Sequence, residues 1–218
     1  MSVPRLRMEG VFVDLDGTII DSKEAYSEAA RVAFQHVGHN LEKLLVAMEI
    51  PRRIEQGMPL DDIVGDETEE FLRVYLNAYY SIAKTRTHPF AYVGETLQEL
   101  SKRTKLALIT MRRMPKEDII EELDRFGLAQ FFSYITTALD VHKPKPSPDA
   151  LVEAMRTLKV EVRNCLIVGD SVMDIRAGKA AGIKTAAVLT GLFKLEELAK
   201  EQPDYILKDF SQLLKIIA

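Results

Sequence analysis

The chain of 218 residues contains a single cysteine, Cys165, and lacks any apolar run long enough to cross a membrane. One cysteine excludes an internal disulfide and any zinc site built from several cysteines. A membrane-spanning helix needs roughly 18 or more consecutive apolar residues. Acidic residues interrupt the apolar stretch that follows Arg5 and Arg7, which does not fit a signal peptide. These absences predict a cytoplasmic protein without a membrane partner.

An excess of basic residues is also absent. Lysine and arginine total 29 against 33 for aspartate and glutamate, which gives a formal net charge of −4. A surface that binds nucleic acid carries the opposite balance, so no nucleic-acid partner is expected. The sequence contains no internal repeat and no low-complexity segment. Its length fits one large domain, or a medium domain with a small one.

The segment 11–21, VFVDLDGTIID, is the most informative stretch of the chain. Its start, Val11 to Val13, is too continuously apolar for a strand with one wet face, so we expect a central strand of a parallel sheet. Asp14 and Asp16 follow at its carboxyl end, where parallel sheets place their chemistry, and strand alternation points both to the same side. Two close carboxylates need a cation or a shared proton, and we hypothesise a divalent metal. An Asp-Gly pair between apolar stretches also fits a hairpin turn.

Apolar segments elsewhere alternate between strand and helix patterns. Strands are expected at residues 9–14, 104–110, 132–138, 164–169, 184–188 and 204–207, and helices at 94–102, 115–126, 147–158, 171–181 and 210–217. Strands that alternate with helices predict a doubly wound parallel, Rossmann-like sheet with right-handed crossovers.

Residues 22–88 break this alternation because they show helical patterns and no strand. The helices are expected at 22–37, with Ser22 as its cap, at 41–50 and at 66–84, with breaks at Pro51 and at the Gly-Met-Pro segment 57–59. The aromatic stripe in 66–84 is typical of a helix-bundle core. We therefore predict an inserted all-helical cap domain at 22–88 and an α/β catalytic core formed by 1–21 and 89–218.

Polar side chains follow four of the expected strands, at the edge where a parallel sheet carries its chemistry. They are Asp14 and Asp16, Thr110, Lys145 and Asp170. Each has an ordinary explanation alone, since a threonine can simply belong to a turn and a lysine in a loop is usually solvated. Ser171 and Asp174 alone form a helix capping box. The combination is what indicates a site.

The chemistry of this set is coherent. Carboxylate oxygens from Asp14, Asp16 and Asp170 suit a hard cation such as Mg²⁺. The hydroxyl of Thr110, the backbone amide of Met111 and the ammonium of Lys145 can hold the oxygens of a phosphate. Phosphoryl transfer needs mainly positioning and neutralisation of negative charge, and a metal-ligated carboxylate can attack phosphorus to give an aspartyl-phosphate.

Four segments resemble, in the right order, the four motifs of the haloacid dehalogenase-like superfamily. They are DLDGTIIDS at 14–22, Thr110 after an apolar strand, KPSPD at 145–149, and GDSVMDIRAG at 169–178 with Ala-Ala-Gly at 180–182. The helical insert resembles the cap of the phosphoglycolate phosphatase and β-phosphoglucomutase branch. The resemblance implies a magnesium-dependent phosphatase that hydrolyses a small phosphorylated metabolite, with phosphoglycolate as the leading candidate, through an aspartyl-phosphate.

The resemblance also implies a role for each acidic residue. Asp14 would be the nucleophile, and Asp16 would protonate the leaving oxygen and then activate water, a role that a raised pKa would suit. Mg²⁺ would be held by the Asp14 carboxylate, the Asp16 backbone carbonyl and Asp170. Asp174 would be a further ligand or a neighbour of the ligands.

Two positions depart from the family pattern or leave a choice open. Met111 stands where a small or polar residue is common, which matters only if that side chain is needed. Two lysines, Lys143 and Lys145, are candidates for the third motif. Lys145 is preferred because the segment 146–149, Pro-Ser-Pro-Asp, follows it as in the family.

The cap is expected to face the substrate through residues 55–60, around Gly57. Arg52, Arg53 or Arg112 could pair with a substrate carboxylate or a second phosphate, although arginines are common on any surface. The histidines show no metal-ligand spacing, and solvated or capping roles are expected for all of them; they are His36, His39, His88 and His142.

Other functions fit part of the pattern. A phosphomutase of the β-phosphoglucomutase type would use the same residues around the phosphoryl group. A 2-haloacid dehalogenase is less favoured, because it needs no metal and lacks the second aspartate at the position of Asp16. A non-catalytic phospho-acceptor module is shorter and carries no helical insert. An inactive scaffold is disfavoured by the intact set of polar residues.

Overall fold

The computed structural model describes residues 5–39 and 46–218. The chain divides into two compact units, one formed by Met1–Ile20 with Pro89–Ala218 and the other by Asp21–His88. We refer to them as the core unit and the helical unit. No helix in the described part of the chain combines the length and the apolarity that crossing a lipid bilayer requires.

The core unit contains a six-stranded sheet with the order β5-β4-β1-β6-β7-β8, and every neighbouring pair is parallel. Its strands are β1 (Gly10–Val13), β4 (Lys105–Ile109), β5 (Tyr134–Thr136), β6 (Cys165–Gly169), β7 (Lys184–Val188) and β8 (Tyr205–Leu207). Strand β1 has β4 and β5 on one side and β6, β7 and β8 on the other. The predicted doubly wound parallel sheet is therefore confirmed.

Burial explains why β1 takes a central place. Val11, Phe12 and Val13 are each 0% exposed, as expected of a strand covered on both faces. The hairpin alternative for the Asp-Gly pair does not form, because both neighbours of β1 are parallel strands. The next strand, β2 (Ile20–Asp21), pairs instead with β3 (His88–Pro89) in a separate two-stranded sheet.

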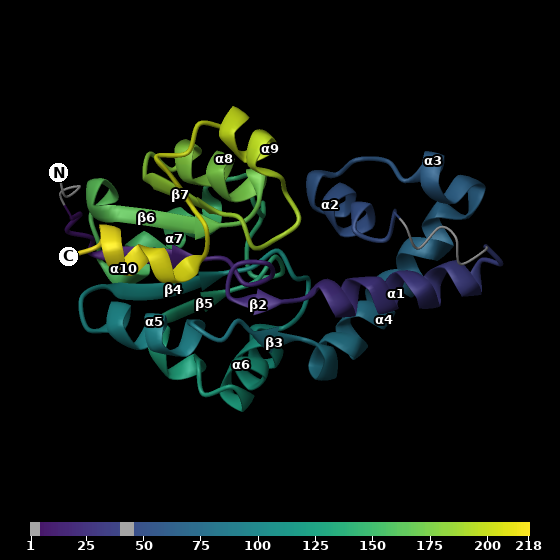
Figure 1. Ribbon diagram of the computed structural model, residues 1–218, viewed down its shortest axis with the longest axis horizontal. Coiled ribbons are helices and arrows are strands. Elements are labelled where there is room, and N and C mark those ends of the chain that lie inside the picture. Colours follow the sequence, from purple (N-terminus) through teal and green to yellow (C-terminus); the bar gives the residue numbers. More distant parts are fainter. Residues whose placement is uncertain (1–4, 40–45) are drawn as a thin grey trace. The chain divides into compact units, whose positions relative to one another are not determined.

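Helices lie on both faces of the six-stranded sheet, as Figure 1 shows. They are α5 (Val93–Ser101), α6 (Lys116–Arg125), α7 (Asp149–Leu158), α8 (Val172–Ala180), α9 (Leu195–Lys200) and α10 (Leu213–Ile216), with 3₁₀ turns η3 (Ala129–Phe131), η4 (Val162–Asn164) and η5 (Phe210–Gln212). Helix α9 is missing from the sequence prediction, because its six residues are too few to show a periodic pattern.

The packing of α7 and α8 fixes the geometry of the functional edge. Residues of α7 share one apolar cluster with Phe12 of β1 and Ile167 of β6. Helix α8 approaches the sheet closely at Gly178, where an added Cβ would lie 2.5 Å from side-chain methyl groups of both Ile167 and Thr185. The last turn of α8 is thereby held close to β6 and β7, while its first residue follows the end of β6 after only two residues.

The helical unit consists of α1 (Lys23–His36), α2 (Glu49–Gln56), α3 (Asp61–Val64), the 3₁₀ turn η2 (Gly65–Glu67) and α4 (Thr68–Arg86). Helices α1 and α4 form its core through contacts between aromatic rings. The ring centroids of Tyr26 and Tyr79 are 4.9 Å apart, and those of Phe34 and Phe71 are 4.8 Å apart. The aromatic stripe of α4 is therefore core, as predicted.

Three local predictions in the helical unit differ from the structure or fall partly on residues that it does not describe. Pro51 does not break a helix but lies in the first turn of α2, where its missing N–H would have no helical partner in any case. Residues 41–45 of the predicted helix 41–50 lie outside the described residues, and of the remainder only Glu49 and Ile50 belong to an α-helix, the first turn of α2. Ser22 stands at the N-cap of α1, but its side chain makes no capping hydrogen bond to that helix.

The loop around Gly57 ends α2, as predicted. Gly57 has a φ of 64°, and the N–H of Met58 donates to the carbonyl of Arg53 at 2.8 Å. This left-handed ending favours glycine because a Cβ is strained there. Helix α3, which follows at once, was not predicted.

Candidate active site

The carboxyl ends of β1, β4 and β6 meet at one edge of the sheet. Val13 is in register with Leu108 of β4 and with Val168 of β6. Beyond the strand ends, the N–H of Asp14 still donates to the carbonyl of Val168 at 3.0 Å. Residues that follow these strands are therefore neighbours, although at least 60 positions separate them in the chain.

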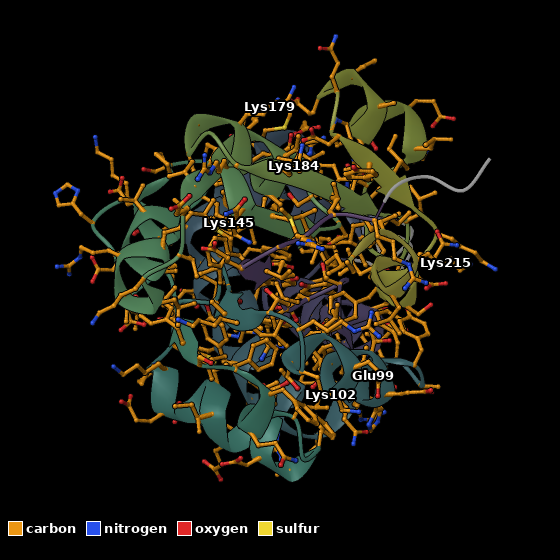
Figure 2. All side chains as sticks on the ribbon, turned by 90° about the vertical axis from the view of Figure 1, so that its left-hand side faces the viewer. Glu99, Lys102, Lys145, Lys179, Lys184 and Lys215 are labelled. Carbon is orange, nitrogen blue, oxygen red and sulfur yellow. The ribbon has the colours of Figure 1, made fainter. Side chains whose placement is uncertain are left out.

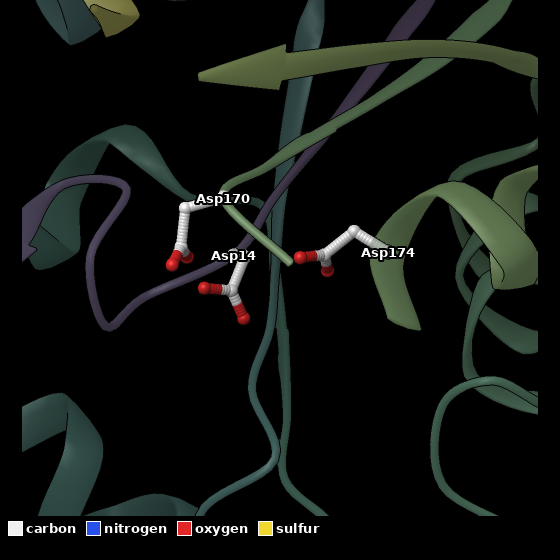
Figure 3. A group of neighbouring side chains, drawn as sticks. All are labelled: Asp14, Asp170 and Asp174. Atoms are coloured by element: carbon white, nitrogen blue, oxygen red, sulfur yellow. The ribbon is translucent and has the colours of Figure 1, made fainter. Parts of the chain in front are cut away.

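Three aspartates converge at this edge. Asp14 follows β1, Asp170 follows β6 and Asp174 lies in the first turn of α8. Each offers a carboxylate oxygen within 4.8 Å of the others, and all three side chains are buried. Figure 3 shows the three side chains approaching from these different segments. We call Asp14, Asp170 and Asp174 the acid cluster.

Lys145, whose position is labelled in Figure 2, binds two members of the acid cluster. Its Nζ donates to Asp14 Oδ1 at 2.6 Å, to Asp174 Oδ1 at 2.6 Å and to the carbonyl of Ile109 at 3.1 Å. Burial alone would lower the pKa of Lys145, but the two carboxylates outweigh it and raise the pKa, so the ammonium stays charged. Lys143, the other candidate, is exposed.

Asp174 serves two partners at once. Its Oδ2 accepts from the backbone N–H of Ser171 at 3.2 Å, and Ser171 Oγ accepts from the N–H of Met173 at 3.0 Å. The capping box that the sequence indicates is therefore present. The second oxygen of the same carboxylate binds Lys145, so the start of α8 orients the lysine as well.

The charge of the acid cluster suits a cation. Its three carboxylates and the ammonium of Lys145 carry a formal charge of −2 when ionised. Burial raises the pKa of Asp14 above its usual range, and Lys145 opposes this while Asp174 and Asp16 add to it. Closely spaced buried carboxylates are unfavourable without a counter-ion, and an all-oxygen donor set matches a hard divalent ion.

Asp170 is enclosed by the loop that follows β7, for which the sequence predicted no role. The N–H of Leu192 donates to Asp170 Oδ2 at 3.2 Å, and Thr190 Oγ1 donates to the carbonyl of Gly17 at 2.5 Å. An added Cβ at Gly191 would lie 1.6 Å from the Asp170 carboxylate, and one at Gly17 would lie 2.6 Å from it. The Thr-Gly pair at 190–191, one residue beyond the end of β7, was the available signal, because β7 ends at the same edge.

Asp16 and Arg112 form a second charged group beside the acid cluster. Arg112 Nε donates to Asp16 Oδ2 at 2.8 Å and its Nη2 donates to Oδ1 at 2.7 Å, while Nη1 donates to Glu122 Oε2 at 2.5 Å. Sequence reasoning missed Glu122, which lies on α6 and is only 3% exposed. The sequence predicts Arg112 as a candidate to bind the substrate. In the structure Arg112 instead pairs with two carboxylates of the protein.

The other residues predicted for the site lie just after β4 or in the helical unit. Thr110 follows β4, is buried, and accepts the N–H of Arg112 on its Oγ1 at 3.2 Å. Met111 beside it is half-buried. Gly57 belongs to the helical unit. Within that unit Arg52 pairs with Glu49, and Arg53 pairs with Asp62; the roles of these cap residues remain predictions.

A parallel α/β sheet that gathers carboxylates and a buried lysine at the ends of its central strands has the groups to position a phosphate and neutralise its charge. Comparison with known proteins agrees. A family model described as haloacid dehalogenase-like hydrolase matches residues 11–188. The chain belongs to this family, so the predicted family and the prediction of an enzyme are confirmed.

Relatives with assigned activities are similar along nearly their whole length. A phosphoglycolate phosphatase of Aquifex aeolicus is 32% identical over 215 residues, which cover 96% of this chain and 97% of that protein. The pyrophosphatase PpaX of Halalkalibacterium halodurans is 29% identical over 215 residues, which cover 97% and 98%. A solved haloacid dehalogenase-like family hydrolase from Streptococcus pneumoniae has a TM-score of 0.76 at 22% identity, covering 95% of this chain and 97% of that one.

Proposed function

We propose that the protein is a magnesium-dependent phosphatase that hydrolyses a small phosphomonoester through an aspartyl-phosphate on Asp14. The observation that carries the proposal is the buried contact of Asp14 with Lys145 beside two further carboxylates. A nucleophile next to a fixed positive charge and a cation site is what phosphoryl transfer requires, since charge spreads over the phosphoryl oxygens.

The first half of the reaction uses Asp14. A carboxylate oxygen of Asp14 attacks phosphorus, the bond from phosphorus to the leaving oxygen breaks, and Asp16 supplies a proton to that oxygen. Lys145 and the hydroxyl of Thr110 hold phosphoryl oxygens. Mg²⁺, when bound by the side chains of Asp14 and Asp170 and the backbone carbonyl of Asp16, would neutralise charge on the phosphate.

The second half restores the enzyme. Asp16 takes a proton from a water molecule, the water oxygen attacks the phosphorus of the aspartyl-phosphate, and the bond to the Asp14 oxygen breaks. Inorganic phosphate leaves and Asp14 is again a carboxylate. Asp174 stays outside this bond exchange and holds Lys145 in place.

We assign the choice of substrate to the helical unit acting as a cap, with Gly57 and the arginines near it as the candidate contacts. Two relatives suggest the chemistry of the substrate, because one is named phosphoglycolate phosphatase and the other pyrophosphatase. Both names describe small anions that carry phosphate. A phosphorylated metabolite also fits a cytoplasmic enzyme.

The test is a panel of phosphorylated metabolites that includes phosphoglycolate and pyrophosphate, assayed with Mg²⁺ or with EDTA. We expect one or a few small phosphates to release inorganic phosphate only with the metal. Glucose 1-phosphate is included because isomerisation instead of hydrolysis would establish the phosphomutase alternative. Equal turnover of 2-haloacids in EDTA would overturn the proposal in favour of a dehalogenase.

A further inference from the structure

Arg112 connects the site to the interior of the core unit through three hydrogen bonds to carboxylates. Two of its nitrogens bind both oxygens of Asp16, and the third binds Glu122. The side chains of Arg112 and Glu122 are 3% and 4% exposed, and that of Asp16 is 15% exposed. The Arg112 guanidinium and Glu122 are therefore buried, whereas Asp16 is the more exposed of the two carboxylates that Arg112 binds.

The main chain of Arg112 is held as well. Its N–H donates to Thr110 Oγ1 at 3.2 Å, and its carbonyl accepts the N–H of Ala138 at 3.1 Å. A bidentate arginine–carboxylate pair fixes both the distance and the plane of the carboxylate, which a lysine cannot do. For Arg112 to bind a substrate instead, it would have to abandon buried charges, at a large cost in free energy.

We propose that Arg112, anchored by Glu122, is a positioning residue that orients the Asp16 carboxylate to accept a proton from the attacking water. The inference rests on the proposed function, in which Asp16 acts in both halves of the reaction. Both Asp16 oxygens accept from Arg112, so the two bonds fix the position and the plane of the carboxylate. These two bonds use one lone-pair site on each oxygen, out of about four that a carboxylate offers.

Arg112 would therefore act in the second half of the reaction, the hydrolysis of the aspartyl-phosphate. Water loses a proton to Asp16, its oxygen forms a bond to phosphorus, and the bond from phosphorus to Asp14 breaks with the electron pair going to Asp14. If Arg112 no longer fixes Asp16, this step slows while formation of the aspartyl-phosphate continues. Phosphorylated enzyme then accumulates.

The experiment uses p-nitrophenyl phosphate as the probe, because its leaving group needs no proton and the first half is then insensitive to Asp16. Rapid-mixing measurements record p-nitrophenol released per enzyme molecule. The first variant, Arg112→Lys, keeps the positive charge but cannot form the bidentate pair with Asp16. The second, the double variant Arg112→Met/Glu122→Met, leaves no unpaired buried carboxylate at Glu122. The matched control is Arg125→Lys, at an exposed position of α6.

We expect both Arg112 variants to release close to one equivalent of p-nitrophenol in a rapid burst. Their kcat should then fall at least about tenfold, since general base catalysis contributes roughly 10²–10⁴-fold. Arg125→Lys should match the wild type. A loss of kcat without a burst, or no loss at all in folded protein, would overturn the inference. Full turnover by Asp14→Asn would instead refute the proposed function itself.

Discussion

Lys145 Nζ lies 2.6 Å from Asp14 Oδ1, with both side chains buried. The ammonium also binds Asp174, so it balances charge on two carboxylates that β1 and α8 bring together. In the proposed reaction the same ammonium holds the phosphoryl group. We therefore expect this one side chain to support both folding and catalysis, so its removal should affect both.

Replacing Lys145 by methionine should remove activity and lower stability together. The change leaves buried carboxylates without their partner, and breaking a buried ion pair in this way costs about 3–5 kcal/mol. Urea unfolding monitored by circular dichroism measures the loss. Adding Mg²⁺ should restore part of the stability but not the activity. Lys143→Met is the matched control because that side chain is exposed, and a loss of similar size there would contradict the assignment.

Gly191→Ala should weaken metal binding. A Cβ at this position would lie 1.6 Å from the Asp170 carboxylate, and Gly191 does not have a positive φ, so the steric contact is the main effect expected. Disturbing groups that orient metal ligands typically costs about 10–100-fold in affinity. Calorimetric titration with Mg²⁺ measures this without an activity assay. Gly94→Ala, whose Cβ would have no contact closer than 4.0 Å, should bind normally; unchanged affinity in Gly191→Ala would exclude this role of the loop.

Cys165 should resist alkylation in the folded protein. Burial raises the pKa of its thiol to about 12, so very little thiolate, the reactive form, exists at pH 8. In urea the pKa returns toward its usual range and labelling should become at least about 10³-fold faster. Rates with iodoacetamide in buffer and in urea test this. Rapid labelling of folded protein would show that β6 is open to solvent at this position.

Phe71→Ala should destabilise the helical unit and leave metal binding by the core unit intact. Phe71 is fully buried within the apolar cluster of the helical unit, and such a truncation costs about 3–5 kcal/mol. Thermal unfolding measures the loss and Mg²⁺ titration measures binding. Asn77→Ala, at an exposed position of α4, is the control. A parallel loss of Mg²⁺ affinity would show that the two units do not act independently.

The sequence was sufficient to predict where the acid cluster meets. Buried parallel strands are recognisable from continuous apolar runs, and their carboxyl ends must share one edge. Asp14, Thr110 and Asp170 each follow such a run, so their proximity needs no knowledge of side-chain conformations. The preference for Lys145 over Lys143 rested on the family-like segment 146–149 alone, and burial, which no local pattern records, separates the two lysines more clearly.

Other features depend on contacts that no local pattern records. The pair of Asp16 and Arg112 joins residues 96 positions apart, and its formation depends on side-chain conformations. Glu122 resembles any acidic residue on an amphipathic helix until α6 buries it. Pro51 was misread because a proline in the first turn of a helix and a proline that ends one look alike when the surrounding pattern is weak.

The central claim is that Asp14 becomes phosphorylated. The direct measurement is acid quenching of the enzyme during turnover of p-nitrophenyl phosphate with Mg²⁺, reduction of the acyl-phosphate by borohydride, and peptide mass spectrometry. The account predicts conversion of residue 14 to homoserine, absent when EDTA replaces Mg²⁺ and absent in Asp14→Asn. Reduction at Asp16 or Asp170 instead, or turnover by Asp14→Asn at the wild-type rate, would contradict it.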